Sequence, residues 1–573
     1  MKAKEEVIIV DKINEVLWEA KAITRSEGLG DRDFFIVISN AYLYTCDNNL
    51  IYKKDNSLFN IAKQLNEGIS SEVIERLFNL FSKLNIDGIR MLISEILSGK
   101  NNSSNSFIET SNNYISELAC ELLEFGDSGE TVLDLGSGTG NFLANVYKKI
   151  GDLSLESSKL IGIEINAEVA NISNMALSIL GDKNTSHEII TGNAFDKIEY
   201  IYSKGYVFPP LGMRKILEDG VRKSHLFPHL NLTNRNTGEW LFIDSLLSGL
   251  SKNNGRAIAL VSGKSLFNNF DLEYRDELIK SGLLEGIIEL PTGSLTFSGV
   301  KVFMLVFSQG NTSVKFVDAS SIVNAENKRY VNFELPVQLI KAMYYSNEVK
   351  SKSNSELLSA TNLMPSTITV DVQKLENGVQ LKDVAEVFIG NQYTLGVFEN
   401  KGMLTDKKTG YRILTSSDIE DGVVSWSNLQ SIDYKDTKFD KFAVKYGDVV
   451  VTSKSSKVKT VVVDIEPKEK ILVTGGMLIV RPDQEKLNPT YLKMFLDSKD
   501  GQAAIKSIQK GVSIVTLNAS GLETIEIPLI DIKKQGSKAD RYNIELSTLI
   551  AYKNEIKRIE KSLENILSDN EGD

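Results

Sequence analysis

Residues 131–143 read TVLDLGSGTGNFL and decide the fold of the chain around them. The apolar run from Val132 to Leu135 predicts a short buried strand, and residues 141–149 after the glycines predict a helix. Glycine is needed where the backbone takes positive φ or comes close to a ligand. Such a turn also leaves backbone N–H groups at a helix N-terminus, a place that favours negative charge. The stretch therefore predicts a strand–turn–helix unit of an α/β domain.

Two classes of ligand use a turn of this kind. A dinucleotide site requires G-x-G-x-x-G, and Asn141 stands where the third glycine would be. The form D-x-G-x-G-x-G, from Asp134 to Gly140, fits S-adenosylmethionine (SAM) better, because Asp134 can face the ligand ammonium. A plain turn without a ligand is the alternative. The cofactor contacts expected here are Asp134, Gly136, Ser137, Gly138, Gly140 and Phe142.

Two further polar residues end the next predicted strands. The segment LIGIE (160–164) ends in Glu164, where an acid can accept hydrogen bonds from ribose hydroxyls. The segment EIITGNA (188–194) contains Asn193, an amide suited to an adenine edge. Alternation of strand and helix is typical of a doubly wound sheet, on which ligands bind at the carboxyl ends of the strands. Asp134, Glu164 and Asn193 would meet there.

Length and composition indicate a soluble multidomain protein. The chain has 573 residues, which predicts two to four domains, and its 42% hydrophobic and 25% charged content is ordinary for a globular protein. No apolar run is long enough to span a bilayer, so no membrane association is expected. The N-terminus, MKAKEE, lacks the core of a signal peptide. These features predict a cytoplasmic location.

Few residues could hold a metal ion or form a disulfide. Cys46 and Cys120 lie far apart in sequence, and His187, His225 and His229 are interpreted as surface or loop residues. We therefore expect no metal site. The net charge of −11 does not indicate a nucleic-acid-binding protein. Any DNA contact must therefore come from local basic patches or from a partner subunit.

Six motifs follow one another between about Phe107 and Ser320: residues 107–111 (FIETS), 134–142, 238–242 (GEWLF), 255–261 (GRAIALV), 287–294 (IIELPTGS) and 296–302 (TFSGVKV). In this order they resemble the modification subunit of type I restriction-modification systems, which are N6-adenine DNA methyltransferases. This resemblance implies SAM as cofactor and adds Thr110, in the family's Phe-Thr-Pro motif, as a cofactor contact. Ser111 replaces the proline of that motif.

The chain departs from the family at the catalytic motif. The family has Asn or Asp, two prolines and an aromatic residue, whereas this chain has Phe208, Pro209, Pro210 and Leu211, its only consecutive prolines. In the family the Asn accepts hydrogen bonds from the adenine amino group, and the aromatic ring stacks on a base flipped out of the duplex. Phe208 cannot accept a hydrogen bond, and Leu211 has no aromatic face.

Loss of one such contact costs about a hundredfold or more in rate. Two losses together predict little or no adenine methylation by this chain alone, beside an intact cofactor turn. The alternative is an active N6-adenine DNA methyltransferase that tolerates Phe208.

The texture changes to strands and turns after about residue 375. Strand-like segments lie at 381–390, 411–419, 445–452, 478–482 and 522–529, and a helix begins at 488–492. This series, over residues 379–529, resembles the target recognition domain of type I specificity subunits, which reads one half-site of double-stranded DNA. The chemistry favours polar and basic loop residues for this contact: Gln392, Tyr393, Ser453, Lys454, Ser456, Lys457 and Lys459. A basic run suits phosphates: Lys435, Lys438, Lys441 and Lys445. A solvated surface is the alternative for any single lysine.

The last segment predicts a helix with a heptad seam, in which apolar residues recur three and four apart: Leu549, Tyr552, Ile556, Ile559, Leu563 and Ile566. In the resembled specificity subunits such a helix pairs with another. With one recognition domain here, we expect pairing with a second copy or a related chain; docking on its own chain is the alternative. An active methylase and nuclease or translocase subunits are possible further partners.

The predicted architecture is a multidomain α/β protein. It comprises a helical N-terminal domain (1–105, with helices at 5–26 and 71–98), a doubly wound SAM-dependent methyltransferase-like domain (106–325) and a linker with a helix (326–375). An α+β target recognition domain (376–535) and a C-terminal coiled-coil-like helix (536–573) follow. The predicted function is SAM-bound, sequence-specific DNA binding in a restriction-modification or phage-defence system.

Overall fold

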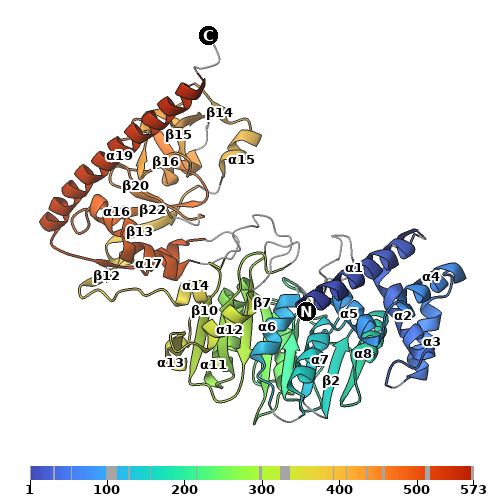
Figure 1. Cartoon of the computed structure of the whole chain (residues 1–573). Helices are drawn as coiled ribbons and strands as arrows, with labels where there is room; N and C mark the ends of the chain where they lie inside the picture. The colour runs from blue at the N-terminus through green and yellow to red at the C-terminus, as the bar shows by residue number, and fades with distance from the viewer. Residues whose placement is uncertain are drawn as a thin grey trace. The chain divides into compact units, whose positions relative to one another are not determined.

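The computed structural model describes residues 2–26, 28–29, 33–52, 54–98, 113–126, 129–154, 157–213, 216–295, 300–322, 336–391, 393–407, 409–433, 437–454, 458–509 and 516–568. The chain forms two compact units, Met1–Thr369 (unit 1) and Val370–Asp573 (unit 2) (Figure 1).

A nine-stranded mixed sheet is the centre of unit 1, in the order β11-β10-β8-β9-β7-β4-β1-β2-β3. Its strands are β1 (Thr131–Leu135), β2 (Ser158–Glu164), β3 (Thr185–Thr191), β4 (Lys204–Val207), β7 (Arg256–Ser262), β8 (Leu284–Glu289), β9 (Val302–Phe307), β10 (Ser313–Asp318) and β11 (Lys350–Ser353). A small hairpin, β5 (Val221–Lys223) and β6 (Asn231–Thr233), lies outside it.

The part of the sheet from β3 to β7 is parallel, as the alternation of strands and helices predicts. Beyond it, β9 runs antiparallel between β7 and β8, which makes the whole sheet mixed rather than purely doubly wound. The chain passes from β1 to β2 and β3 on one side, then returns to form β4 on the other side of β1. The point where strand order reverses lies between β1 and β4, and ligands of open α/β sheets bind at such a point.

Helices cover the sheet because their apolar faces share its core. α6 (Asn113–Leu122), α7 (Asn141–Leu153) and α12 (Val337–Tyr345) contribute buried residues to the same cluster as β1, β7 and β9. The remaining helices of this region are α8 (Ala167–Leu180), α9 (Glu239–Ser248), α10 (Gly263–Phe267), α11 (Leu272–Lys280), α13 (Asn354–Leu357) and α14 (Pro365–Ile368). The central strands are buried along their whole length, as expected for strands covered on both faces.

The N-terminal helices are α1 (Lys2–Ser26), α2 (Asp33–Asp47), α3 (Asn56–Leu65), α4 (Ser71–Phe81) and α5 (Ile86–Leu97). The single helix predicted over 71–98 is two helices, because the Asn85 side chain caps α5 by accepting from the Gly88 N–H. Ile172, Met175 and Ile179 of α8 complete the core of these helices. The helical region is therefore packed onto the sheet domain within unit 1.

Two further sequence interpretations differ from the structure. Residues 350–357, interpreted as linker, form β11 and α13, and β11 pairs antiparallel with β10. An edge strand needs only backbone partners on one side, so its Lys and Ser side chains carry no apolar signal. His187, interpreted as a surface or loop residue, lies in β3 with its ring bonded to the Tyr147 hydroxyl at 2.8 Å. Burial lowers its pKa to about 4.

Unit 2 is an α+β fold built on two four-stranded sheets, β13-β22-β19-β20 and β14-β18-β15-β21. Its strands are β12 (Gly378–Gln380), β13 (Ala385–Ile389), β14 (Leu404–Thr405), β15 (Tyr411–Leu414), β16 (Ile419–Glu420), β17 (Val423–Val424), β18 (Gln430–Ile432), β19 (Val449–Thr452), β20 (Thr460–Val462), β21 (Lys470–Val473), β22 (Met477–Pro482) and β23 (Glu526–Pro528). Its helices are α15 (Leu395–Asn400), α16 (Pro489–Asp497), α17 (Lys499–Ile508), α18 (Ala519–Leu522) and α19 (Ile532–Ser568), the long red helix of Figure 1.

Candidate functional site

The glycine turn lies at the point where strand order reverses. Leu135, the last residue of β1, is in register with Val207, the last residue of β4, so the turn and the Phe208–Leu211 segment leave adjacent strands. The backbone N–H groups of Gly136 and Ser137 both donate to the Ile163 carbonyl, at 2.8 and 2.9 Å. The turn is thereby tied to the end of β2 and open on its other side.

The glycines have two different functions. Gly136, Gly138 and Gly140 all have positive φ, at 81°, 53° and 87°. A Cβ at Gly136 or Gly138 would meet no atom within 4 Å, whereas a Cβ at Gly140 would lie 2.5 Å from the Ser173 Oγ of α8. The first two glycines therefore leave room for a ligand to approach the backbone, and the third permits helix α7 to pack against α8.

Asp134 places a carboxyl group beside the turn. Its side chain is 2% exposed. Burial, and after it the nearby Glu164 carboxylate, raise the pKa of Asp134 well above its usual range. Burial of a carboxylate beside a second carboxylate is unfavourable unless a cation compensates. The SAM ammonium and sulfonium are cations, so the chemistry of this donor set fits SAM.

Glu164 ends β2, the strand next to β1, and Asn193 follows β3, the strand beyond it. The Glu164 carboxylate accepts from the Gly138 N–H at 3.0 Å and from the Asn166 N–H at 2.9 Å. The β2–β3 register sets Glu164 opposite Thr191, two residues before the exposed Asn193. Ile165, which sequence reasoning missed, follows Glu164 and is 73% exposed. An exposed isoleucine next to this acid offers an apolar face suited to a purine.

Ser137 and Phe142 face the protein interior. A Cβ on Gly162 would lie 2.7 Å from the Ser137 Oγ, which packs close to β2 and has no hydrogen-bond partner among the described residues. The Phe142 ring stacks on the Tyr206 ring with centroids 4.0 Å apart. These two expected contacts thus hold the turn in place from below. Thr110, the remaining expected contact, lies outside the described residues.

Phe208 and Leu211 pack as apolar side chains on the domain core. Pro209 between them is buried and Pro210 is exposed. The segment continues directly from β4, so residue 208 occupies the place at the strand end where the family's asparagine is expected. No hydrogen-bonding side chain is present at 208–211, and the two residues instead extend the hydrophobic contacts of the sheet.

Glu239 supports this segment from beneath, a role that sequence reasoning missed. It is the first residue of α9 and is 0% exposed. Its Oε1 accepts from the Gly212 N–H at 3.5 Å and from the Ser262 N–H, at the end of β7, at 3.4 Å. Its Oε2 has no partner among the described residues. A carboxylate at a helix N-terminus is favoured by the helix dipole, and here it joins the segment that follows β4 to the end of β7.

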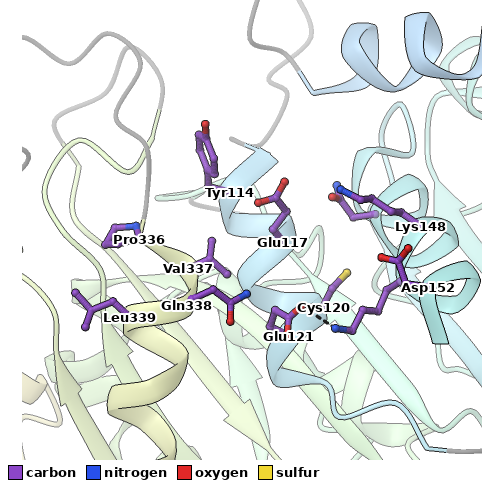
Figure 2. Close-up of a pocket in the computed structure, with 12 residues that line it drawn as sticks. Tyr114, Glu117, Cys120, Glu121, Lys148, Asp152, Pro336, Val337, Gln338 and Leu339 are labelled. Atoms are coloured by element: carbon purple, nitrogen blue, oxygen red, sulfur yellow. Dashed lines mark hydrogen bonds and ion pairs between the residues drawn. The ribbon is translucent and has the colours of Figure 1, made fainter. Parts of the chain in front are cut away.

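A surface hollow of about 480 Å³ lies between α6, α7 and the start of α12. Figure 2 shows its lining side chains, which include Glu117, Lys148 and Asp152. Glu121 on its floor is paired with Lys149 at 2.7 Å and also with Lys341. The glycine turn does not line this hollow, so we do not assign it as the cofactor crevice.

In unit 2, two loops that carry expected DNA contacts are joined through a third loop. The Gly475 N–H donates to the Tyr393 carbonyl at 3.0 Å, and the Ser453 N–H donates to the Gly476 carbonyl at 2.7 Å. Lys454 is exposed, and its side chain approaches Gly476. We call residues 390–391, 393–394, 453–454 and 473–477 the loop cluster. Tyr393 and Lys454, about 60 residues apart in sequence, thus lie in one region, whereas Ser453, expected as a third contact there, is buried at 8% exposure.

Other expected DNA contacts lie elsewhere. The Lys459 ammonium donates to the carbonyls of Ser416 at 3.2 Å and Ile419 at 2.9 Å, so it is engaged with the protein backbone. Lys441 and Lys445 are exposed. The predictions for Gln392, Lys435, Ser456 and Lys457 lie outside the described residues, as does the side chain of Lys438.

In the described part of the chain, no group of three or more His, Cys, Asp or Glu side chains could hold a metal ion. Among the same residues, no helix has the length and apolar character needed to cross a membrane. Cys46 and Cys120 are free thiols and both are buried.

Comparison with known families identifies the sheet domain. Residues 110–364 match the family model described as N-6 DNA Methylase. This segment is an N-6 DNA methylase domain. The match begins before α6 and ends beyond α13, so it includes β11, in agreement with the structure that joins this strand to the sheet.

Solved structures with a similar chain trace include restriction-modification proteins. The type I methyltransferase subunit from Streptococcus thermophilus is 14% identical with a TM-score of 0.47, covering 61% of this chain and 96% of that chain. A modification subunit of a type I enzyme from Vibrio vulnificus is 14% identical with a TM-score of 0.45, covering 61% and 93%. The type IIG restriction endonuclease BpuSI is 13% identical with a TM-score of 0.42, covering 93% and 74%. The identification of the methylase domain rests on the family match alone.

Proposed function

We propose that the chain is a SAM-binding, sequence-specific DNA-binding subunit of a restriction-modification or phage-defence system, with impaired methyl transfer of its own. The observation that carries the proposal is the contrast at one sheet edge. Asp134 is buried near Glu164, an arrangement that a bound cation would stabilise, whereas Phe208 and Leu211 pack on the core. The buried carboxylate of Asp134 is unfavourable without a ligand, whereas the apolar packing of Phe208 and Leu211 is favourable by itself.

The impairment follows from the chemistry at the end of β4. Methyl transfer to an adenine amino group needs a group that accepts hydrogen bonds from the amino N–H and so makes its nitrogen a better nucleophile. The Phe208 side chain has no such acceptor. Asp134 and Glu164 would hold SAM through its ammonium and ribose, and the bound SAM would supply an electrophilic methyl group. Glu239 would keep the Phe208–Gly212 segment at the end of β7. The residues present thus bind and orient the cofactor without activating an amine.

Transfer of labelled methyl from SAM to unmethylated genomic DNA by the purified chain tests this proposal. We expect SAM binding without label on adenine. Label on adenine would instead support the alternative, an active N6-adenine DNA methyltransferase. The double variant Phe208→Asn with Leu211→Tyr is the complementary test, because it restores the family's acceptor and aromatic ring. Appearance of activity in this variant supports the proposal, and failure despite intact SAM and DNA binding contradicts the argument from the motif.

DNA recognition is assigned to unit 2. Tyr393 and Lys454 supply an aromatic ring and a cation in the loop cluster, suited to bases and phosphates. Replacement of Lys454 by Ala is expected to weaken DNA binding and to reduce the slope of log affinity against log salt by about one. Lys459→Ala is the matched control, because its ammonium already binds two carbonyl groups of the protein.

The subunit would act in an assembly. The long helix α19 carries an exposed apolar seam from Leu549 to Leu563, which suits pairing with another helix. Either a second copy or a related chain would supply the second half-site, and a companion methylase would supply catalysis. Nuclease or translocase subunits would complete a restriction system.

A further inference from the structure

The loop that follows β3 holds the Asn193 side chain in one orientation. Its Oδ1 atom accepts from the Phe195 N–H at 3.0 Å, and its backbone carbonyl accepts from the Asp196 N–H at 3.1 Å. An amide turned by 180° would bring its own N–H groups against the Phe195 N–H, so this backbone donor decides which end is oxygen. Asn193 is exposed, and among the described residues no acceptor bonds to its Nδ2 group. The loop thus presents a hydrogen-bond donor to a ligand.

Residues at the start of the β5–β6 hairpin hold the same loop at the next peptide group. The Arg222 Nη1 group donates to the Phe195 carbonyl, and the His225 Nε2 atom lies 3.0 Å from the same oxygen. The Phe195 ring packs edge-on against the Phe242 ring of α9, with centroids 4.7 Å apart. Phe195 is therefore bonded to Asn193 through its N–H and to Arg222 through its carbonyl.

Asp244 of α9 fixes the Arg222 side chain in turn. The Asp244 carboxylate is 0% exposed and accepts from the Arg222 Nη2 group at 2.9 Å, from the His225 N–H at 2.8 Å and from the Tyr274 hydroxyl at 3.1 Å. A planar guanidinium that is bonded at both Nη atoms has one orientation. We call Asp244, Arg222 and Phe195 the clamp.

The clamp joins three segments that are distant in sequence. Arg222 lies in β5, Asp244 in α9, and Phe195 in the loop between β3 and β4. Burial of a guanidinium is unfavourable unless its hydrogen bonds are made. One end of this guanidinium meets a carboxylate, and the other meets a carbonyl of the loop that carries Asn193. A loop that is held in this way loses little conformational freedom when a ligand binds.

We propose that Arg222 is a positioning residue through which the cofactor site selects adenine over hypoxanthine. The proposal rests on the proposed function, in which the chain binds SAM with its base near Asn193. The Nδ2 group of Asn193 is a donor, and the clamp keeps it turned toward the ligand. Ring nitrogen N1 is an acceptor in adenine, whereas in hypoxanthine it carries a hydrogen. The amide orientation therefore matches adenine and opposes the N–H of hypoxanthine.

The other expected cofactor contacts do not distinguish the two bases. Asp134 faces the ammonium, and Glu164 faces the ribose, in the arrangement that the proposed function assigns to them. Both groups are the same in adenosyl and inosyl compounds. A difference in affinity between two such compounds therefore reports on the base contact alone, which is the contact that the clamp positions.

Calorimetry of the full-length chain with S-adenosylhomocysteine and S-inosylhomocysteine tests the proposal. We expect the wild-type chain to bind the adenosyl compound about tenfold more tightly. Arg222→Met removes the clamp and should reduce this preference to less than about threefold. Lys223→Met is the matched control, because Lys223 is the next residue of β5, is exposed, and points to the opposite face of the strand. It should retain the wild-type preference.

Two further variants separate positioning from stability. Asn193→Ala changes an exposed side chain without touching the clamp and should also bring the preference below about threefold. Adding Arg222→Met to Asn193→Ala should change the preference no further, since Arg222 acts through Asn193. Where Arg222→Met alone unfolds, Arg222→Met with Asp244→Asn replaces it, because that pair leaves no buried charge without a partner. Thermal unfolding of each variant shows that unit 1 is retained.

The outcomes distinguish this proposal from the proposed function. A wild-type chain that binds both compounds equally keeps its cofactor site and overturns the selection alone. A chain that binds neither compound contradicts the proposed function and this proposal with it. Equal loss of affinity for both compounds in the clamp variant, with the tenfold preference retained, would assign Arg222 to the fold and overturn its positioning role.

Discussion

Two halves of one sheet edge carry opposite kinds of side chain. At the ends of β1, β2 and β3 stand Asp134, Glu164 and Asn193, and the buried Asp134 is held near another carboxylate. At the end of β4, the adjoining strand, stand Phe208 and Leu211, which pack on the core. The carboxylates of the first half lower the stability of the folded protein, and the apolar side chains of the second half raise it.

The difference teaches how to distinguish a binding surface from a packing surface. A buried carboxylate without a cation destabilises the protein by itself and persists where a ligand compensates it. An apolar side chain on an apolar core needs no such explanation. The half with Asp134 therefore has the features expected of a ligand site, and the half with Phe208 has those of a packed core. The following predictions test this contrast, beginning with the largest expected effect.

The strongest test removes the charge of Asp134. Asp134→Asn should lower SAM affinity about tenfold to a hundredfold, because a hydrogen bond to a charged group contributes about 1.5–3 kcal/mol. The ligand-free protein should melt at the same temperature or higher, since the buried charge is gone. Isothermal calorimetry and thermal unfolding of one preparation measure both quantities. A lower melting temperature with unchanged SAM affinity would show that Asp134 is structural.

The second test concerns the packing glycine. Gly140→Ala should destabilise unit 1 by about 1–3 kcal/mol, because residue 140 has a φ of 87° and the new Cβ would lie 2.5 Å from the Ser173 Oγ. Gly151→Ala is the matched control on the same helix. Its Cβ meets no atom within 4 Å, so it should stabilise by about 0.5–1 kcal/mol. Urea unfolding of both variants measures the difference, and equal effects would contradict the close contact.

The third test concerns the catalytic half. Phe208→Ala should cost about 1–3 kcal/mol of stability, since a half-buried phenylalanine loses part of its packing, and should change SAM affinity less than about twofold. Denaturant unfolding and calorimetry measure the two effects. A large loss of SAM affinity without loss of stability would place Phe208 in ligand binding and remove the contrast between the two halves.

The smallest effect is the pH dependence of SAM binding. Because the pKa of Asp134 is raised, its carboxyl stays protonated to higher pH, and SAM binds the carboxylate form. Affinity should therefore rise with pH, by at most about tenfold per unit, and this slope should vanish in Asp134→Asn. The ligand-free protein shows the opposite sign. Its folded state binds the proton more tightly than the unfolded state, so the Asp134 contribution to stability falls as pH rises toward the raised pKa.

Local pattern predicted the parts of the site that lie close together in sequence. The glycine turn, the strands before Asp134 and Glu164, and the helix α7 all follow from residues within about ten positions of one another. Their placement at one edge also follows, because parallel strands align their carboxyl ends. Local pattern did not predict which glycine faces open space and which packs against α8. That difference depends on Ser173 of α8, which lies more than thirty residues from Gly140 in sequence.

Contacts distant in sequence account for what pattern missed. Glu239 carries no motif that assigns it a role, and only the fold brings it to Gly212 and Ser262. The polar segment 350–357 joins the sheet through backbone hydrogen bonds, which composition does not record. The loop cluster of unit 2 likewise gathers Tyr393 and Lys454 through a third loop, residues 473–477.

The sequence by itself determined the α/β unit, the acids at the strand ends, the altered Phe208–Leu211 motif and the seam on the last helix. Each depends on residue type and short-range periodicity, which the chain carries locally. Only the tertiary structure decided which glycine faces open space, that Asp134 is buried near Glu164, that Phe208 packs on the core, and which face of α19 is docked. The physical reason is that burial and electrostatic coupling are properties of neighbours in space, and the neighbours come from distant parts of the chain.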